Sequence, residues 1–402
     1  MAHYQPSGLP ESNPTRAEGL LADLHLDLPL LTGLVLLCGF GLLILYSASG
    51  QDMAVMERQV IRLGVAFAVM VAIAQVPPAT LRRWAPWLFA AGILMLIAVL
   101  VAGQVGKGAQ RWLNLGLFRF QPSELVKLAV PMMIAWFLAE KSLPPRWSRL
   151  LMAGVMILIP VLLIARQPDL GTALLVASAG IFVLFLAGLS WRFIGGMVFT
   201  AIPVSWALWE WGMRDYQRNR VLTFLNPERD PLGTGYHIIQ SKIAIGSGGL
   251  YGKGWLNGTQ SYLEFLPEGT TDFIFAVLSE EFGFIGILLL LSLYLVIILR
   301  GLYIAAQAQD TFSRLLGGAV TMVFFVYLFV NTGMVSGILP VVGVPLPLVS
   351  YGGTSLVTIM AGFGILMSIH THRKLLPTCW ARIAWPGFST QATSHVQSPE
   401  ET

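Results

Sequence analysis

The chain has 402 residues, of which 55% are hydrophobic and 11% are charged, and its mean hydropathy is +0.70. An average soluble domain carries roughly 25% charged residues, so this chain lacks the polar side chains to cover soluble domains and its solvent must be a lipid bilayer. The net charge of +4 is small. Its Lys and Arg residues are scattered between apolar blocks, which argues against nucleic acid as a partner.

The apolar blocks predict ten membrane-spanning helices, because one span needs roughly 20 mainly apolar residues. They cover residues 29–48, 60–76, 84–102, 125–139, 149–165, 170–189, 192–211, 272–299, 315–335 and 350–369. We therefore predict an all-α integral membrane protein. It comprises an N-terminal tail (1–28), a single polytopic domain (29–375) and a polar C-terminal tail (376–402). The only cysteines, Cys38 and Cys379, lie in regions that should not meet, so no disulfide is expected.

The orientation of the bundle follows from basic residues in the short loops. An even number of spans puts both termini on one side, and the loops on that side carry most of the Lys and Arg residues, which predicts that this side is cytoplasmic. The large loop between spans seven and eight, residues 212–271, is then outside. Its apolar patches, separated by glycines, predict short helices that rest on the membrane surface or dip into the bundle. Lys107, Arg111, Arg119 and Arg166 in the opposing short loops make the charge asymmetry imperfect.

Several ionisable residues lie near the predicted outer ends of the spans, where such groups are rare and usually face a cavity or a partner. Glu124 and Lys127 are three residues apart and so lie on one helical face. Asp169 and Asp272 open spans six and eight. Each also has a purely structural interpretation. Glu124 and Lys127 could neutralise each other, and both aspartates could be ordinary N-caps.

Asp272 differs from the others because the large loop delivers many cations before reaching it. These are Arg214, Arg218, Arg220, Arg229, Lys242 and Lys253. For Glu280 and Glu281, deeper in span eight, buried structural pairing is the favoured interpretation. Gly246–Gly249 lacks the Lys-Ser/Thr of a phosphate-binding loop and is interpreted as a flexible turn. The histidines are too scattered for a metal site, and no cofactor is predicted.

Fixed cations at the outer membrane face, above an apolar bundle, fit a ligand with a phosphate head and a lipid tail. Glycosyl transfer from a lipid-linked sugar diphosphate would need little more. Cations stabilise the leaving diphosphate, and one carboxylate serves as general base for the acceptor hydroxyl. By analogy with inverting glycosidases, a single displacement inverts the anomeric centre.

The same residues belong to short motifs that resemble the SEDS (shape, elongation, division, sporulation) family, and the likeness extends over residues 27–375. The motifs are 108–112 (GAQRW), 120–124 (FQPSE), 167–172 (QPDLGT), 230–237 (DPLGTGYH), 265–268 (FLPE), 337–340 (GILP) and 347–353 (PLVSYGG). Their order and spacing match ten spans with a large loop after the seventh. The variant at residues 341–345 (VVGVP) resembles the elongation branch of the family rather than the division branch. Residues 268–270 depart from the pattern of the relatives, which affects loop detail only.

The resemblance implies a peptidoglycan glycosyltransferase that polymerises lipid II into glycan strands during elongation and rod-shape maintenance, with release of undecaprenyl diphosphate. It places the enzyme in the bacterial inner membrane with its site on the periplasmic side, beside a class B penicillin-binding protein and the rod-shape elongation complex. Asp272 falls where the family has its essential loop carboxylate. The expected substrate-binding residues are Arg111, Arg119, Glu124, Lys127, Asp169, Arg220 and Lys242. A lipid II flippase and a scaffold for the transpeptidase remain the alternatives.

Overall fold

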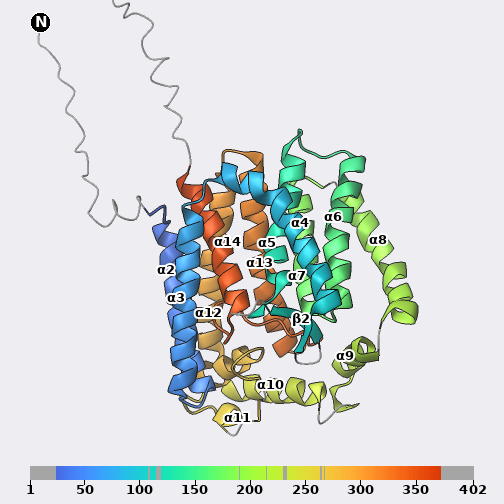
Figure 1. Ribbon diagram of the computed structural model, residues 1–402. Coiled ribbons are helices and arrows are strands. Elements are labelled where there is room, and N and C mark those ends of the chain that lie inside the picture. The colour runs from blue at the N-terminus through green and yellow to red at the C-terminus, as the bar shows by residue number, and fades with distance from the viewer. Residues whose placement is uncertain are drawn as a thin grey trace, which may run out of the picture. The chain divides into compact units, whose positions relative to one another are not determined.

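Every one of the ten predicted apolar blocks coincides with a helix in the computed structural model, which describes residues 24–106, 109–114, 119–189, 191–213, 215–229, 233–262, 265–266 and 268–372. Figure 1 shows these helices running side by side in one bundle. They are α2 (Leu28–Ala48), α3 (Met53–Ala74), α4 (Pro78–Ala102), α5 (Pro122–Ala139), α6 (Trp147–Arg166), α7 (Leu170–Leu186), α8 (Trp191–Ala207), α12 (Ile274–Ala306), α13 (Thr311–Val335) and α14 (Thr354–Thr371).

Seven of these helices (α2, α4, α5, α6, α12, α13 and α14) are long and apolar enough to cross a membrane, and α7 is a shorter apolar helix. The bundle exposes large apolar side chains such as Leu94, Leu151 and Leu288 on its outside, which only a lipid solvent tolerates in such number. The prediction of a helical membrane protein is thus confirmed. The count of ten spans and the side of each loop stay predictions.

Residues of the predicted large loop form short helices, as expected from their glycine-separated apolar patches. These are α9 (Asp215–Leu225), α10 (Thr234–Gly248), α11 (Thr259–Tyr262) and a 3-10 turn (Pro227–Arg229), preceded by a π-helical turn (Leu208–Gly212) that continues α8. In Figure 1, α10 lies across one end of the bundle. Gly246–Gly248 is the end of α10, so the interpretation of these three residues as a flexible turn was wrong, whereas Gly249, the C-cap, begins a turn.

The all-α prediction missed a small antiparallel sheet between α4 and α5. It has the order β1-β2-β3, with β1 at Gln104–Gly106, β2 at Ala109–Asn114 and β3 at Arg119–Phe120. The cause is local. The backbone N–H and C=O groups of this connection need partners near the membrane, and antiparallel pairing of its short extended segments supplies them. Figure 1 shows β2 at the same end of the bundle as α10.

At the opposite end of the bundle, one buried carboxylate joins the start of α2 to α12 and α14. Asp27 is 3% exposed and accepts two hydrogen bonds from the Arg300 guanidinium, from Nε to Oδ1 at 3.0 Å and from Nη2 to Oδ2 at 2.6 Å. His370 Nε2 lies 3.2 Å from Oδ2. The start of α2 therefore meets the C-terminal parts of α12 and α14 on one side of the bundle.

This carboxylate should make stability depend on pH. Burial raises the pKa of Asp27, but hydrogen bonds from Arg300 and from the backbone of Leu30 outweigh it and hold the pKa below its ordinary value of 3.8. A pKa that is lower in the folded state stabilises the fold above the unfolded value, and the contribution is lost as pH falls through the folded value. We expect Asp27→Asn to cost about 1–3 kcal/mol near neutral pH.

The difference between Asp27→Asn and wild type should shrink once the pH falls below about 3.8. Denaturant midpoints in detergent, measured near neutral pH and at about pH 3, check this expectation. Asp52→Asn is the matched control, because Asp52 caps α3 through Ala54 N–H and is exposed. An equal loss for Asp27→Asn at both pH values would contradict the assignment.

Candidate active site

A polar cavity of about 160 Å³ opens where the N-terminal ends of α5, α7 and α14 meet α13 and the loop before α14. It brings together four of the predicted site residues, which come from β2, α5 and the N-terminus of α7. The lining residues are Arg111, Gln121, Glu124, Lys127, Asp169, Thr172, Leu175, Tyr327, Gly343, Val344, Pro345, Thr354 and Ser355.

Asp169 is the N-cap of α7 and also lines the cavity, whereas its contact with a substrate stays a prediction. As the N-cap of α7, its Oδ1 accepts the backbone N–H of Thr172 at 3.2 Å, while Oδ2 lies 3.5 Å from Arg111 Nε and 3.4 Å from Gln121 Nε2. Arg111 Nη2 also donates to the carbonyl oxygen of Pro168 at 2.8 Å. The cap thus fixes a carboxylate that in turn orients the guanidinium at the cavity wall.

Lys127 and Glu124 form the buried pair that their spacing predicts. The two side chains are 5% and 8% exposed, and Nζ lies 2.8 Å from Glu124 Oε2. Nζ also donates to the hydroxyl of Tyr327 on α13 at 2.5 Å. The pair keeps an ammonium charged in a place where burial alone would be costly. It neutralises the charge without removing Lys127 from the cavity.

The four charged groups sum to zero, so an anion is not attracted by net charge alone. Arg111 can still contact an anion because its side chain is 32% exposed, although its Nε is buried and lies 3.5 Å from Asp169 Oδ2. A phosphate oxygen near the cavity mouth would therefore meet the exposed part of this guanidinium beside a buried ammonium. Charge-assisted bonds of this kind are among the strong ones.

Asp272 lies beside this cavity at the start of α12. Its carboxylate faces Gly343 of the cavity wall, because a Cβ built on Gly343 would lie 3.5 Å from Asp272 Oδ2. The buried Asn331 on α13 donates through Nδ2 to the carbonyl oxygens of Asp272 and Val344, both at 2.8 Å. The N-cap position of α12 belongs to Phe273. Asn331 thus fixes the backbone of residue 272 against the loop that carries Gly343.

The remaining predicted residues are not among those that line the cavity. Arg220 is half-buried on α9. Lys242 is exposed on α10, with its aliphatic chain over Gly337 at the end of α13. Arg119 is part of β3, and its side chain lies outside the described part of the structure. Substrate contact by these three residues stays a prediction.

Sequence reasoning missed the uncharged residues that line the cavity, and it also missed two arginines in the first half of α3 that contact the loop before α14. Arg58 Nε donates to the hydroxyl of Tyr351 at 3.3 Å, and the Arg62 guanidinium lies 4.4 Å from the ring centroid of Tyr351. Arg62 also approaches Gly353, at the N-cap of α14. The sequence did contain a signal for them, because Arg58 and Arg62 are four residues apart, on one helical face, directly before a long apolar run.

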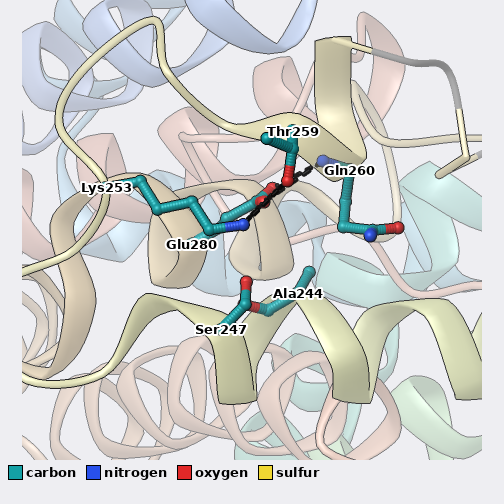
Figure 2. A network of polar contacts seen from close by, with 6 residues as sticks. All are labelled: Ala244, Ser247, Lys253, Thr259, Gln260 and Glu280. Atoms are coloured by element: carbon teal, nitrogen blue, oxygen red, sulfur yellow. Dashed lines mark hydrogen bonds and ion pairs between the residues drawn. The ribbon is translucent and has the colours of Figure 1, made fainter.

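Glu280 has the structural role predicted for it. It is fully buried, and its carboxylate lies 2.6 Å from Lys253 Nζ and accepts hydrogen bonds from the hydroxyl of Thr259 and the backbone N–H of Gln260. Figure 2 shows these groups around one carboxylate. Glu281 has no cation beside it among the described contacts. It accepts a short hydrogen bond from Ser47 instead.

Within the described ranges, no group of three or more His, Cys, Asp and Glu side chains could hold a metal ion. The expectation that no cofactor is needed stays a prediction. The chemistry that this geometry offers is binding of an anionic head group by Arg111 and Lys127, with the Asp272 carboxylate beside it as a proton acceptor.

Known proteins are similar to this chain over most of its length. Residues 28–375 match the FTSW_RODA_SPOVE family, described as "Cell cycle protein". The chain is 58% identical over 352 residues to the peptidoglycan glycosyltransferase MrdB of Escherichia coli K12, covering 88% of this chain and 95% of that protein. It is 37% identical to a probable peptidoglycan glycosyltransferase FtsW of Geobacter metallireducens, with 87% and 96% covered.

Solved structures agree with the sequence comparison. The fold matches a chain in the study "Structural coordination of polymerization and crosslinking by a peptidoglycan synthase complex", with a TM-score of 0.76 at 33% identity over 86% of this chain and 97% of that one. It also matches the rod shape determining protein RodA of Thermus thermophilus, with a TM-score of 0.65 at 29% identity over 86% and 96%. The predicted enzyme class, a peptidoglycan glycosyltransferase, is thereby confirmed. With its helical bundle and the polar cavity at one end of it, the chain belongs to the FtsW/RodA/SpoVE family.

Proposed function

We propose that this chain polymerises lipid II, an undecaprenyl-diphosphate-linked disaccharide-pentapeptide, into glycan strands during cell elongation, and that the cavity around Arg111 and Lys127 is its donor site. One observation carries the proposal. Two cations from separate elements, Arg111 and Lys127, line one cavity whose wall at Gly343 faces the Asp272 carboxylate. A lipid diphosphate needs the cations, and an acceptor hydroxyl needs the carboxylate.

In the proposed reaction, the 4-hydroxyl oxygen of the acceptor sugar attacks C1 of the donor sugar. The bond from C1 to the diphosphate oxygen breaks as the new glycosidic bond forms, so the anomeric configuration inverts. Asp272 accepts the hydroxyl proton. Undecaprenyl diphosphate leaves as an anion whose growing charge is stabilised by Arg111 and Lys127, so no general acid is required.

We place the enzyme in the bacterial cytoplasmic membrane with both termini in the cytoplasm and the cavity on the periplasmic side. Two observations support this orientation. Strand β2, whose Arg111 lines the cavity, lies at the end of the bundle near α10, and the start of α2 and the end of α14 lie together at the other end (Figure 1). The basic residues Arg82 and Arg83 at the start of α4, and Arg149 at the start of α6, lie in helix ends that the positive-inside rule assigns to the cytoplasm.

We also propose a class B penicillin-binding protein of the rod-shape elongation complex as partner. The printed title of one structural match couples polymerisation to crosslinking in a synthase complex. A transpeptidase that links the peptides of the new strand is the activity that such coupling needs. The elongation branch is supported by the higher identity to MrdB than to FtsW, 58% against 37%.

The test is polymerisation of pure lipid II by the purified chain in detergent, alone and with its transpeptidase. Glycan polymer formed without a membrane supports the enzyme. A flippase would instead move labelled lipid II across a liposome membrane and form no polymer. A scaffold would do neither. Absence of polymer under both conditions, with a folded protein, would overturn the proposal.

A further inference from the structure

A second, larger pocket of about 500 Å³ lies on the same end of the bundle, between the α2–α3 turn and the loop that precedes α12. Its size falls in the range of about 300–1,000 Å³ that is usual for small-ligand clefts. It is separate from the cation-lined cavity, and no lining residue is shared between the two. Its lining residues are Ser47, Ala48, Ser49, Gly50, Gln51, Val55, Leu256, Gly258, Thr270 and Glu281.

The lining of this pocket has the chemistry of a site for neutral hydroxyl groups. Ser47, Ser49 and Thr270 offer hydroxyls, and Gln51 offers an amide that both donates and accepts. None of its described lining residues is Lys or Arg. The one charged group among them is the carboxylate of Glu281, which is 1% exposed. Ser47 donates to its Oε1 and the backbone N–H groups of Leu256 and Gly258 lie against the carboxylate, while Oε2 has no well-aligned hydrogen bond from the described residues. A phosphate would be repelled here, whereas a sugar hydroxyl finds acceptors.

Residues 249–260 form one wall of this pocket and are held against α12 by backbone hydrogen bonds. Gly283 interrupts α12 with a φ of +62°, and Glu280 and Glu281 use their carbonyl oxygens to accept the N–H groups of Lys253 and Gly254, both at 3.0 Å. A Cβ at Gly252 would overlap the carbonyl oxygen of Glu281. Figure 2 shows how Glu280 holds Lys253 and Thr259 on the same wall.

The pocket adjoins the reacting centre through Thr270. Only Thr271 separates Thr270 from Asp272, so their Cα atoms lie within about 7 Å of each other. The loop that precedes α14 holds residues 270–272 in place. Tyr351 N–H donates to the Thr270 carbonyl oxygen at 2.9 Å, and Ser350 Oγ donates to the Thr271 carbonyl oxygen at 2.5 Å. Asp272 therefore lies on the short stretch of chain between the cation-lined cavity and the second pocket.

From this arrangement, and resting on the proposed function, we propose that the second pocket is the acceptor subsite, which binds the neutral terminal saccharide that carries the nucleophilic hydroxyl. The donor sugar is joined directly to its diphosphate and must therefore sit beside the cations. The acceptor's terminal sugar is separated from its own diphosphate by the second sugar of the disaccharide, so a pocket with hydroxyls and one carboxylate suits it. Glu281 acts as a positioning residue through Ser47, whose hydroxyl it holds.

The test measures donor use and acceptor use separately, with a lipid II analogue that cannot act as acceptor. A labelled lipid II with hydrogen in place of the acceptor 4-hydroxyl can serve only as donor, and its coupling to unlabelled lipid II is followed while the concentration of each is varied. Val55→Trp fills the pocket, and Glu281→Gln keeps the bond to Ser47 but removes the charge. Val60→Trp is the control, because Val60 is 52% exposed on the outer surface of the same helix.

We expect Val55→Trp to raise the acceptor concentration for half-maximal rate by about tenfold, which corresponds to the loss of one or two hydrogen bonds. Glu281→Gln should raise it by about threefold, and neither variant should move the donor value more than about twofold. Val60→Trp should resemble wild type.

Unchanged acceptor values in folded Val55→Trp and Glu281→Gln proteins would overturn the assignment, as would equal rises for donor and acceptor. If Val55→Trp does not fold, Glu281→Gln decides alone. A Mg²⁺ requirement that Glu281→Gln removes would reveal a cation site and refute the saccharide assignment. Failure of the wild type to couple the substrates at all would instead count against the proposed function.

Discussion

Lys127→Met is expected to abolish polymerisation and to destabilise the protein at the same time. Removal of the ammonium leaves the Glu124 carboxylate buried without its partner, since Lys127 Nζ is the cation 2.8 Å from it. Breaking a buried ion pair in this way costs about 3–5 kcal/mol. The hydroxyl of Tyr327 also loses its hydrogen bond from Nζ. Thermal unfolding in detergent and polymer formation from lipid II measure the two effects separately.

The double variant Glu124→Gln/Lys127→Met separates folding from catalysis. With both charges gone, no buried carboxylate is left unpaired, so most of the stability should return. Polymer formation should not return, because the donor diphosphate still lacks its buried cation. Lys141→Met, at an exposed position beyond the end of α5, is the surface control. Recovery of activity in the double variant would exclude Lys127 from the donor site.

The bundle could be predicted from sequence because each span carries its own signal. An apolar run such as residues 29–48 must be helical in a bilayer, where every backbone polar group needs an internal partner. The β1–β3 sheet gave no comparable signal, since its strands are two to six residues long. Their pairing depends on how closely α4 and α5 approach each other.

The site was predicted only in part, because spacing within one helix is visible in a sequence and proximity between helices is not. Glu124 and Lys127 are one helical turn apart, so their pairing followed from the sequence. Tyr327 and Asn331, from a helix some 200 residues later in the chain, looked like ordinary polar residues of an apolar span. Their contacts with Lys127 and Asp272 exist only once α13 packs beside α5 and the start of α12.

The second pocket could not be predicted from the sequence either, because it also depends on contacts between distant segments. Ser47 and Gln51 resemble any polar turn between two spans, and Glu281 resembles a buried structural carboxylate. Only the break of α12 at Gly283 lets the preceding loop fold back over residues 280 and 281 and enclose a pocket there. A backbone break inside an apolar run is poorly encoded by hydropathy, because a single glycine is tolerated in many spanning helices.

Asp272→Asn is expected to reduce polymer formation at least about a hundredfold, the lower end of what a positioned general base contributes. Asparagine has nearly the same shape, and the backbone carbonyl of residue 272 keeps its hydrogen bond from Asn331. The protein should therefore fold normally. Polymerisation of pure lipid II, measured beside the thermal unfolding midpoint, checks both expectations. Asp310→Asn, which leaves an N-cap acceptor for the Ser313 N–H of α13, should change stability little and keep its activity.

Donor binding distinguishes a base from a residue that only shapes the site. If Asp272 takes the proton of the acceptor, Asp272→Asn should still bind a donor that lacks the acceptor hydroxyl, with a dissociation constant within about twofold of wild type. If the carboxylate mainly orders the loop that carries Gly343, donor affinity should fall together with the rate, because Gly343 lines the donor cavity. A folded Asp272→Asn protein that polymerises lipid II at the wild-type rate would remove this residue from the reaction, and the proton acceptor would have to be sought elsewhere in the cavity, first at Asp169.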